Sequence, residues 1–96
     1  MSAFDIAKKY VEIGEFSEAV KYYGVVFGYS YASEAFKVKE GILRPLKPQV
    51  NLSHIIFAEA HSLIESNKIS RDLASQMFEI GCKKGVALYR PPLHIK

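Results

Sequence analysis

The chain contains a run of twelve residues, Tyr22 to Ser33, without a single charged side chain, and this run limits the fold more than any other feature. Apolar residues recur through and around it every three or four positions, which is the period of an α-helix. They are Ala19, Val20, Tyr23, Phe27, Tyr31, Ala35 and Val38. Because a helix that lacks charge on every face is surrounded by protein, the segment is predicted to lie in a bundle centre or a subunit interface.

Capping signals place one helix before this segment and mark the ends of the segment itself. Ser2 opens a capping box for a helix over about residues 3–13. The glycine-containing turn at 14–16 stops that helix, and Ser17 is predicted to cap the long one. Gly41 then has the position of the residue just past a helix end, so the long helix is expected to finish before it.

The second half of the chain predicts two more helices after a loop with prolines at 45 and 48. Asn51 or Ser53 is expected to cap the third helix, which ends at the polar turn 66–68, and Ser70 is expected to cap the fourth. The fourth helix, ended by prolines 91 and 92, should bury Leu73, Ala74, Met77, Ile80, Ala87 and Leu88. Since no useful strand pattern occurs, the predicted fold is all-α, an antiparallel four-helix bundle in a single domain over residues 1–96.

Three small residues, Gly24, Gly28 and Ala32, lie four apart on the long helix and would let a second helix approach closely. An interior glycine costs about 0.8–1 kcal/mol relative to alanine, so an offsetting interaction is expected. Close helix packing, including packing across a two-fold axis, would supply it, whereas a kink or simple sequence tolerance remains the alternative. The predicted helix-packing or dimer residues are Tyr23, Gly24, Phe27, Gly28, Tyr31 and Ala32.

Composition excludes several classes of protein. With 49% hydrophobic and 24% charged residues, the chain has a globular balance that argues against disorder. No apolar run reaches the ~18–20 residues that span a bilayer, so no membrane insertion is expected. The single cysteine cannot form an internal disulfide and, together with a start unlike a signal peptide, predicts a cytoplasmic location.

The positive charge is concentrated toward the end of the chain, where residues 71–96 hold five basic and two acidic side chains. Lys83, Lys84, Arg90 and His94 are therefore candidates for binding phosphate or RNA. The alternative is that lysines near a helix C-terminus offset the helix dipole.

No catalytic or metal-binding constellation emerges from the remaining candidates, and no cofactor is expected. His54 and His61 are seven residues apart on one helix, roughly 10 Å, which is too far for one metal ion with ligands about 2 Å away. Cys82 would need a nearby base to act as a nucleophile, so a buried and inert thiol is the preferred interpretation.

One local stretch resembles a tetratricopeptide hairpin, with Tyr10, Gly14, Phe16, Ala19 and Tyr23 at the positions of that repeat's tyrosine, glycine and following aromatic and small residues. This resemblance implies a scaffold that holds a peptide in a groove. It covers one repeat, whereas stacked repeats need about three copies for stability.

A longer resemblance is to the HEPN superfamily. It rests on the turn 14–16, on the segments 39–42, 66–73 and 87–89, and on the long-helix residues Ala19, Tyr22, Tyr23, Phe27, Ala32 and Ala35. The resemblance implies a helical bundle that pairs into a homodimer. It also implies a binding or regulatory role beside a minimal nucleotidyltransferase, as in a toxin–antitoxin pair.

Some HEPN members cleave RNA with an arginine followed by a histidine, and this chain departs from that pattern. Lys84 stands where the arginine is expected, and lysine lacks the planar fork that grips a phosphate. Arg90 and His94 are separated by two prolines and a leucine, which break the helix that would aim them together. We therefore carry over the fold and the pairing but not the nuclease, and a ribonuclease with a degenerate motif remains the last alternative.

Overall fold

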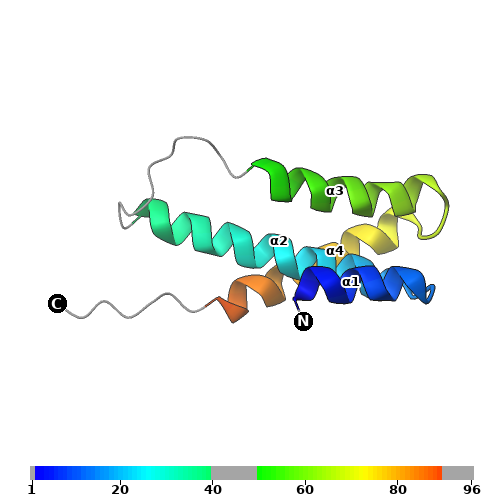
Figure 1. Ribbon diagram of the computed structural model, residues 1–96, viewed down its shortest axis with the longest axis horizontal. Coiled ribbons are helices and arrows are strands. Elements are labelled where there is room, and N and C mark those ends of the chain that lie inside the picture. The colour runs from blue at the N-terminus through cyan, green and yellow to red at the C-terminus, as the bar shows by residue number, and fades with distance from the viewer. Residues whose placement is uncertain (1, 40–49, 90–96) are drawn as a thin grey trace.

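The computed structural model describes residues 2–39 and 50–89, with side-chain surroundings for 2–33 and 54–89. Its helices are α1 (Ala3–Glu12), α2 (Phe16–Lys39), α3 (Val50–Glu65) and α4 (Arg71–Leu88) (Figure 1). No strand occurs in the described ranges, so the predicted all-α class with four helices is confirmed. The predicted breaks at Gly41 and at the prolines lie outside the described residues.

Two of the predicted helix caps are confirmed by hydrogen bonds. The Ser2 hydroxyl accepts the backbone N–H of Asp5 at 3.2 Å, and the Ser70 hydroxyl accepts the backbone N–H of Leu73 at 3.2 Å. Ile69, the residue before the second cap, is buried in the same cluster as Ala74, which is the arrangement of a hydrophobic staple. Local sequence therefore defines the starts of α1 and α4.

The other predicted caps are wrong. The Glu15 carbonyl accepts the N–H of Ala19 at 3.0 Å, so α2 begins at Phe16, two residues earlier than a cap at Ser17 would allow. Asn51 and Ser53 lie inside α3, which begins at Val50.

Both described interhelical turns close with the same backbone device. Gly14 and Asn67 have φ angles of +83° and +61°, in the left-handed region. The Glu15 N–H donates to the Tyr10 carbonyl at 2.9 Å, and the Lys68 N–H donates to the Leu63 carbonyl at 2.9 Å. This is the Schellman pattern, which satisfies the last carbonyls of α1 and α3 and reverses the chain after each.

Helix α2 is the centre of the molecule, with α1, α3 and α4 each packed against it (Figure 1). Consecutive helices alternate in direction, so α2 and α4 run in the same direction. In a regular up-and-down bundle these two helices would lie on a diagonal. Here they form the closest pair, and the α1 backbone lies apart from α3 and α4.

Four glycines allow the close contact between α2 and α4. A Cβ on Gly24 would meet the Phe78 carbonyl oxygen, and a Cβ on Gly28 would meet that of Cys82. From the other side, Gly81 faces the Lys21 carbonyl and Gly85 faces the Val25 carbonyl. The close approach that the sequence predicts for the glycines of α2 is thus made with α4 of the same chain.

The predicted buried stripe of α4 is wrong for four of its six members. Ala74 is buried and Met77 half-buried, but four other members are exposed: Leu73, Ile80, Ala87 and Leu88. Gly81 and Gly85 face α2 instead. Since backbone contact at these glycines fixes how α4 is rotated about its axis, the larger apolar side chains on the neighbouring face turn outward.

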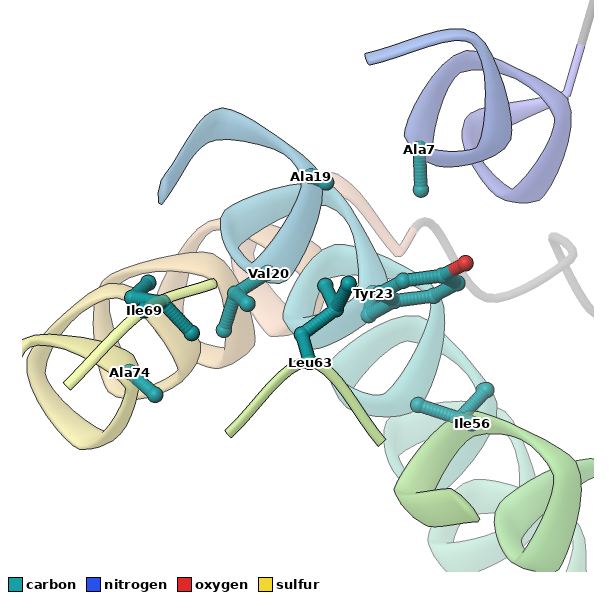
Figure 2. Packing of buried hydrophobic residues seen from close by; sticks show 8 residues of the cluster. All are labelled: Ala7, Ala19, Val20, Tyr23, Ile56, Leu63, Ile69 and Ala74. Atoms are coloured by element: carbon teal, nitrogen blue, oxygen red, sulfur yellow. The ribbon is translucent and has the colours of Figure 1, made fainter. Parts of the chain in front are cut away.

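The core lies where α1, α3 and the start of α4 meet the first half of α2 (Figure 2). Its buried members are Ala7, Ala19, Val20, Tyr23, Ile56, Leu63, Ile69 and Ala74. Tyr23 is fully buried and packs edge-on against Phe4 with ring centroids 5.9 Å apart, while its hydroxyl donates to Glu59 Oε1 at 3.2 Å. Tyr23 therefore joins α1, α2 and α3.

Residues 29–33 of α2 are less enclosed by the other helices than a bundle centre would be. Tyr29 is 47% exposed and Tyr31 is 65% exposed, whereas Phe27 and Ala32 are half-buried. The chain's own helices therefore cover the uncharged segment only in part.

Candidate functional site

A groove of about 450 Å³ runs between α3 and α4 with α2 as its floor. Its lining is mostly apolar and consists of Val20, Phe57, Ala60, His61, Ile64, Ala74, Ser75, Phe78, Glu79 and Cys82. The groove exists because α4 lies directly on α2 at its glycines, while α3 approaches α4 at few positions. Apolar clefts of this size with a few polar groups are typical binding sites.

Three phenylalanines, one from each surrounding helix, form an aromatic cluster at the groove. The ring centroid of Phe27 lies 5.0 Å from that of Phe57 and 5.6 Å from that of Phe78, and the last two lie 5.5 Å apart. Phe57 is half exposed even so, at 50%. The cluster therefore leaves apolar ring surface in contact with water.

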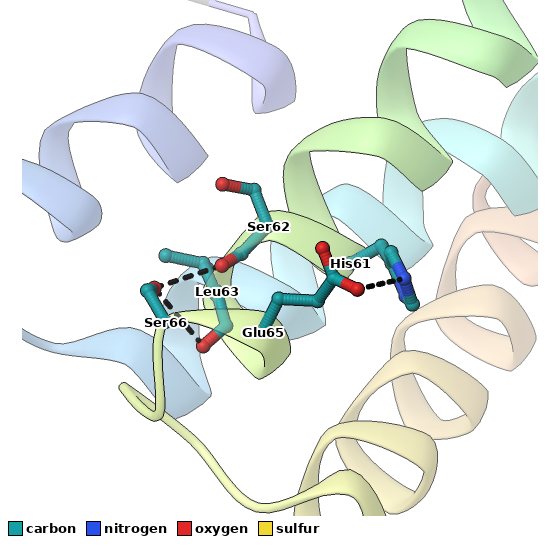
Figure 3. Close-up of polar contacts among 5 residues, drawn as sticks. All are labelled: His61, Ser62, Leu63, Glu65 and Ser66. Atoms are coloured by element: carbon teal, nitrogen blue, oxygen red, sulfur yellow. Dashed lines mark hydrogen bonds and ion pairs between the residues drawn. The ribbon is translucent and has the colours of Figure 1, made fainter.

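Polar side chains form the edges of the groove. On α3, His61 Nε2 lies 3.2 Å from Glu65 Oε2 (Figure 3). On α4, Lys83 Nζ lies 3.3 Å from Glu79 Oε2. All four side chains are more than half exposed, so water screens both pairs and each contributes little to stability.

Cys82 lies in the α4 wall of the groove and is half-buried. Burial raises the pKa of its thiol, and the nearby carboxylate of Glu79 raises it further. A raised pKa keeps the sulfur protonated at neutral pH, and a thiol is a weaker nucleophile than a thiolate.

The candidate phosphate-binding residues are placed in part. Lys83 and Lys84 are exposed on α4, while Arg90 and His94 lie outside the described residues. His54 and His61 are exposed on α3, and no group of three potential metal ligands occurs in the described part of the chain.

A second apolar surface lies on the face of α4 that carries the outward-turned side chains, away from the groove. Here it is called the α4 stripe, and it consists of Leu73, Met77, Ile80, Lys84 and Leu88. Leu73, Ile80 and Leu88 are exposed, with Ile80 at 50%.

The sequence predicted neither the groove nor the outward position of the α4 stripe. One signal could have indicated the rotation of α4, because Gly81 and Gly85 repeat the four-residue spacing of Gly24 and Gly28. Two matching glycine pairs favour a direct contact between the helices that carry them.

No family model matches the chain, and neither the curated proteins nor the solved structures contain a match. Within the described ranges, no helix has the length and apolar character required to span a bilayer.

Proposed function

We propose that this chain is a non-catalytic binding module of the HEPN-like type that works as a homodimer. The α4 stripe is the observation that carries the proposal. It leaves large apolar side chains exposed in a row on one helix, where a twin subunit would remove them from water. The exposed Tyr29 and Tyr31 on the uncharged part of α2 add to the apolar surface.

The spacing of the stripe supports helix-to-helix pairing. Leu73, Met77, Ile80 and Lys84 follow one another at alternating intervals of four and three residues. This is the spacing of a coiled-coil seam, in which one polar residue at an inner position selects the register of pairing at some cost in stability. Lys84 occupies such an inner position, and this would give it a role other than phosphate binding.

The proposed role is regulatory, and the resemblance to HEPN proteins suggests the partner. Such bundles stand beside minimal nucleotidyltransferases, so we propose an enzyme of that kind as the protein bound by the dimer. The module would act by binding alone, since the arginine and histidine pattern of the nuclease members is not preserved in the sequence.

Light scattering coupled to size exclusion tests the dimer. The wild-type chain should have a mass near twice its 10.8 kDa. Ile80→Lys should return it to the monomer, because a charge at the centre of the stripe would lose its hydration on pairing. Val86→Lys is the matched control, since Val86 is 47% exposed on another face of α4 and should leave the mass unchanged. A wild-type monomer at micromolar concentration would refute the proposed dimer.

The second candidate is a peptide-binding scaffold of the tetratricopeptide type, and the groove between α3 and α4 favours it. This function needs no self-association. A monomer that binds helical or extended peptides in the groove would favour the scaffold over the dimeric module.

A further inference from the structure

We propose that the α3–α4 groove binds one amphipathic helix of a protein partner, with apolar side chains in the groove and a basic side chain on Glu79. The proposal rests on the chain being a binding module, as proposed above, but does not require the dimer.

The arrangement of the helices favours a helical occupant. Helices α2, α3 and α4 form three positions of a bundle, whereas α1 packs on another side of α2 and keeps its backbone away from α3 and α4. The position across α3 and α4 is therefore left open in the described structure. A helix in a groove between two helices continues the packing of the bundle, and such grooves are a recurring mode of peptide recognition.

The size of the groove sets the number of anchoring side chains. An apolar cavity of about 150 Å³ holds a benzene molecule. At about 450 Å³, the groove accommodates about three side chains of similar bulk. An amphipathic helix supplies three such anchors at positions i, i+4 and i+7 of one face.

The charge of the groove selects the polar side chain of the partner. Of the described residues that line the groove, Glu79 alone has a formal charge at neutral pH. Glu79 and Cys82 both line the groove, and the Glu79 carboxylate adds to the raised pKa of the Cys82 thiol. The Lys83 ammonium that pairs with it is 76% exposed and can be exchanged for a partner's lysine or arginine at little cost.

The test uses a synthetic, fluorescently labelled helix of about 15 residues, the length at which an isolated helix begins to be stable. It carries leucines at i, i+4 and i+7 with one lysine beside them, and two sister peptides carry glutamate for lysine or serines for the leucines. Fluorescence anisotropy measures binding to the full chain. The alkylation rate of Cys82, the only cysteine in the sequence, reports whether the peptide covers the groove.

We expect the leucine–lysine peptide to bind, to slow the alkylation of Cys82, and to bind more tightly than either sister peptide. Ser75→Trp should fill the groove from an exposed position and weaken binding at least about tenfold. The control is Ser62→Trp, the same change at an exposed position on α3 outside the groove lining, which should leave binding intact.

Reversal of one charge tests the partner's chemistry. Glu79→Arg should lower the affinity for the lysine peptide by about two- to fivefold and raise the affinity for the glutamate peptide by a similar factor. These are the magnitudes expected for exposed ion pairs. An equal effect on both peptides would contradict the pairing with Glu79. Binding of all three peptides without any effect of Ser75→Trp would overturn the groove as the binding surface.

Other occupants have their own signatures, and each would overturn the proposal. Cys82 alkylation that slows with rising protein concentration, without peptide, would assign the groove to a second copy of the chain. Alkylation that accelerates when residues 90–96 are removed would assign it to the chain's own terminus. Since the mass in solution is measured separately, failure of the dimer and failure of the groove are distinguishable.

Discussion

At the scale of single residues, Gly81 shows why a residue without a side chain decides the position of a helix. Replacement by alanine would favour the helical state by about 0.8–1 kcal/mol from propensity alone. Here the added methyl group would meet the Lys21 carbonyl, so α2 and α4 would have to separate. We therefore expect Gly81→Ala to lower the free energy of unfolding by about 2 kcal/mol, measured by urea denaturation.

The control for this prediction measures the difference in helix propensity between alanine and glycine in the same protein. Ala58 is exposed on α3, and Ala58→Gly should cost about 1 kcal/mol. If Gly81→Ala were as stable as the wild type or more so, the backbone contact between α2 and α4 could not be present.

Tyr23 makes stability depend on pH in the alkaline range. Its burial, together with the nearby Glu59 carboxylate, raises its pKa from the ordinary value of 10.0 to about 12. In the unfolded chain the phenol loses its proton near the lower value, whereas in the folded chain it keeps the proton until the higher one. The contribution of Tyr23 is therefore complete below the lower value and is lost as the pH rises through the window between them.

Urea denaturation at neutral pH and at a pH within this window measures the effect. The wild type should lose more stability between the two conditions than Tyr23→Phe, which has no phenol to ionise. If both proteins lost stability equally, the burial of the Tyr23 hydroxyl against Glu59 would be refuted.

At the scale of the helices, the sequence predicted what depends on neighbouring residues. Ser2 and Ser70 cap their helices as expected, because a cap is a contact over three positions of the chain. The prediction of which face of α4 is buried was wrong. Apolar side chains show which face is unfavourable in water, but they do not show which other surface, if any, covers that face. Gly81 and Gly85 carry no apolar side chain, so they were absent from a stripe chosen by hydrophobicity.

The helices also differ in how firmly they are held. Glycine contacts along α2 and α4 join their backbones directly, whereas α3 depends on a few buried side chains such as Ile56 and Leu63 and on the Tyr23–Glu59 hydrogen bond. Fewer buried contacts imply a smaller free energy of local opening. We expect amides within α2 and α4 near the glycines to exchange hydrogen most slowly and those of α3 measurably faster. Equal protection of α3 and α4 would contradict the open groove between them.

At the scale of the whole molecule, the all-α class follows from the sequence, but the candidate site does not. The groove requires that α4 lie on α2 while α3 stays apart from α4, and this depends on contacts between residues more than fifty positions apart, such as Gly24 and Phe78. Periodicity within one segment holds no information on such a contact. The sequence did indicate, through its uncharged run, that α2 is central and needs cover beyond a single neighbour.

The rotation of α4 about its axis determines the rest of the architecture, because it closes the core, opens the groove and turns the α4 stripe outward. Nuclear Overhauser effects in solution test it most directly, since they require protons within about 5 Å, which is the reach of packed side chains and backbones. We expect such effects from the Gly81 and Gly85 α-protons to the backbone of Lys21 and Val25. Effects from the methyl groups of Leu73 and Ile80 to that backbone, with none from the glycines, would contradict it.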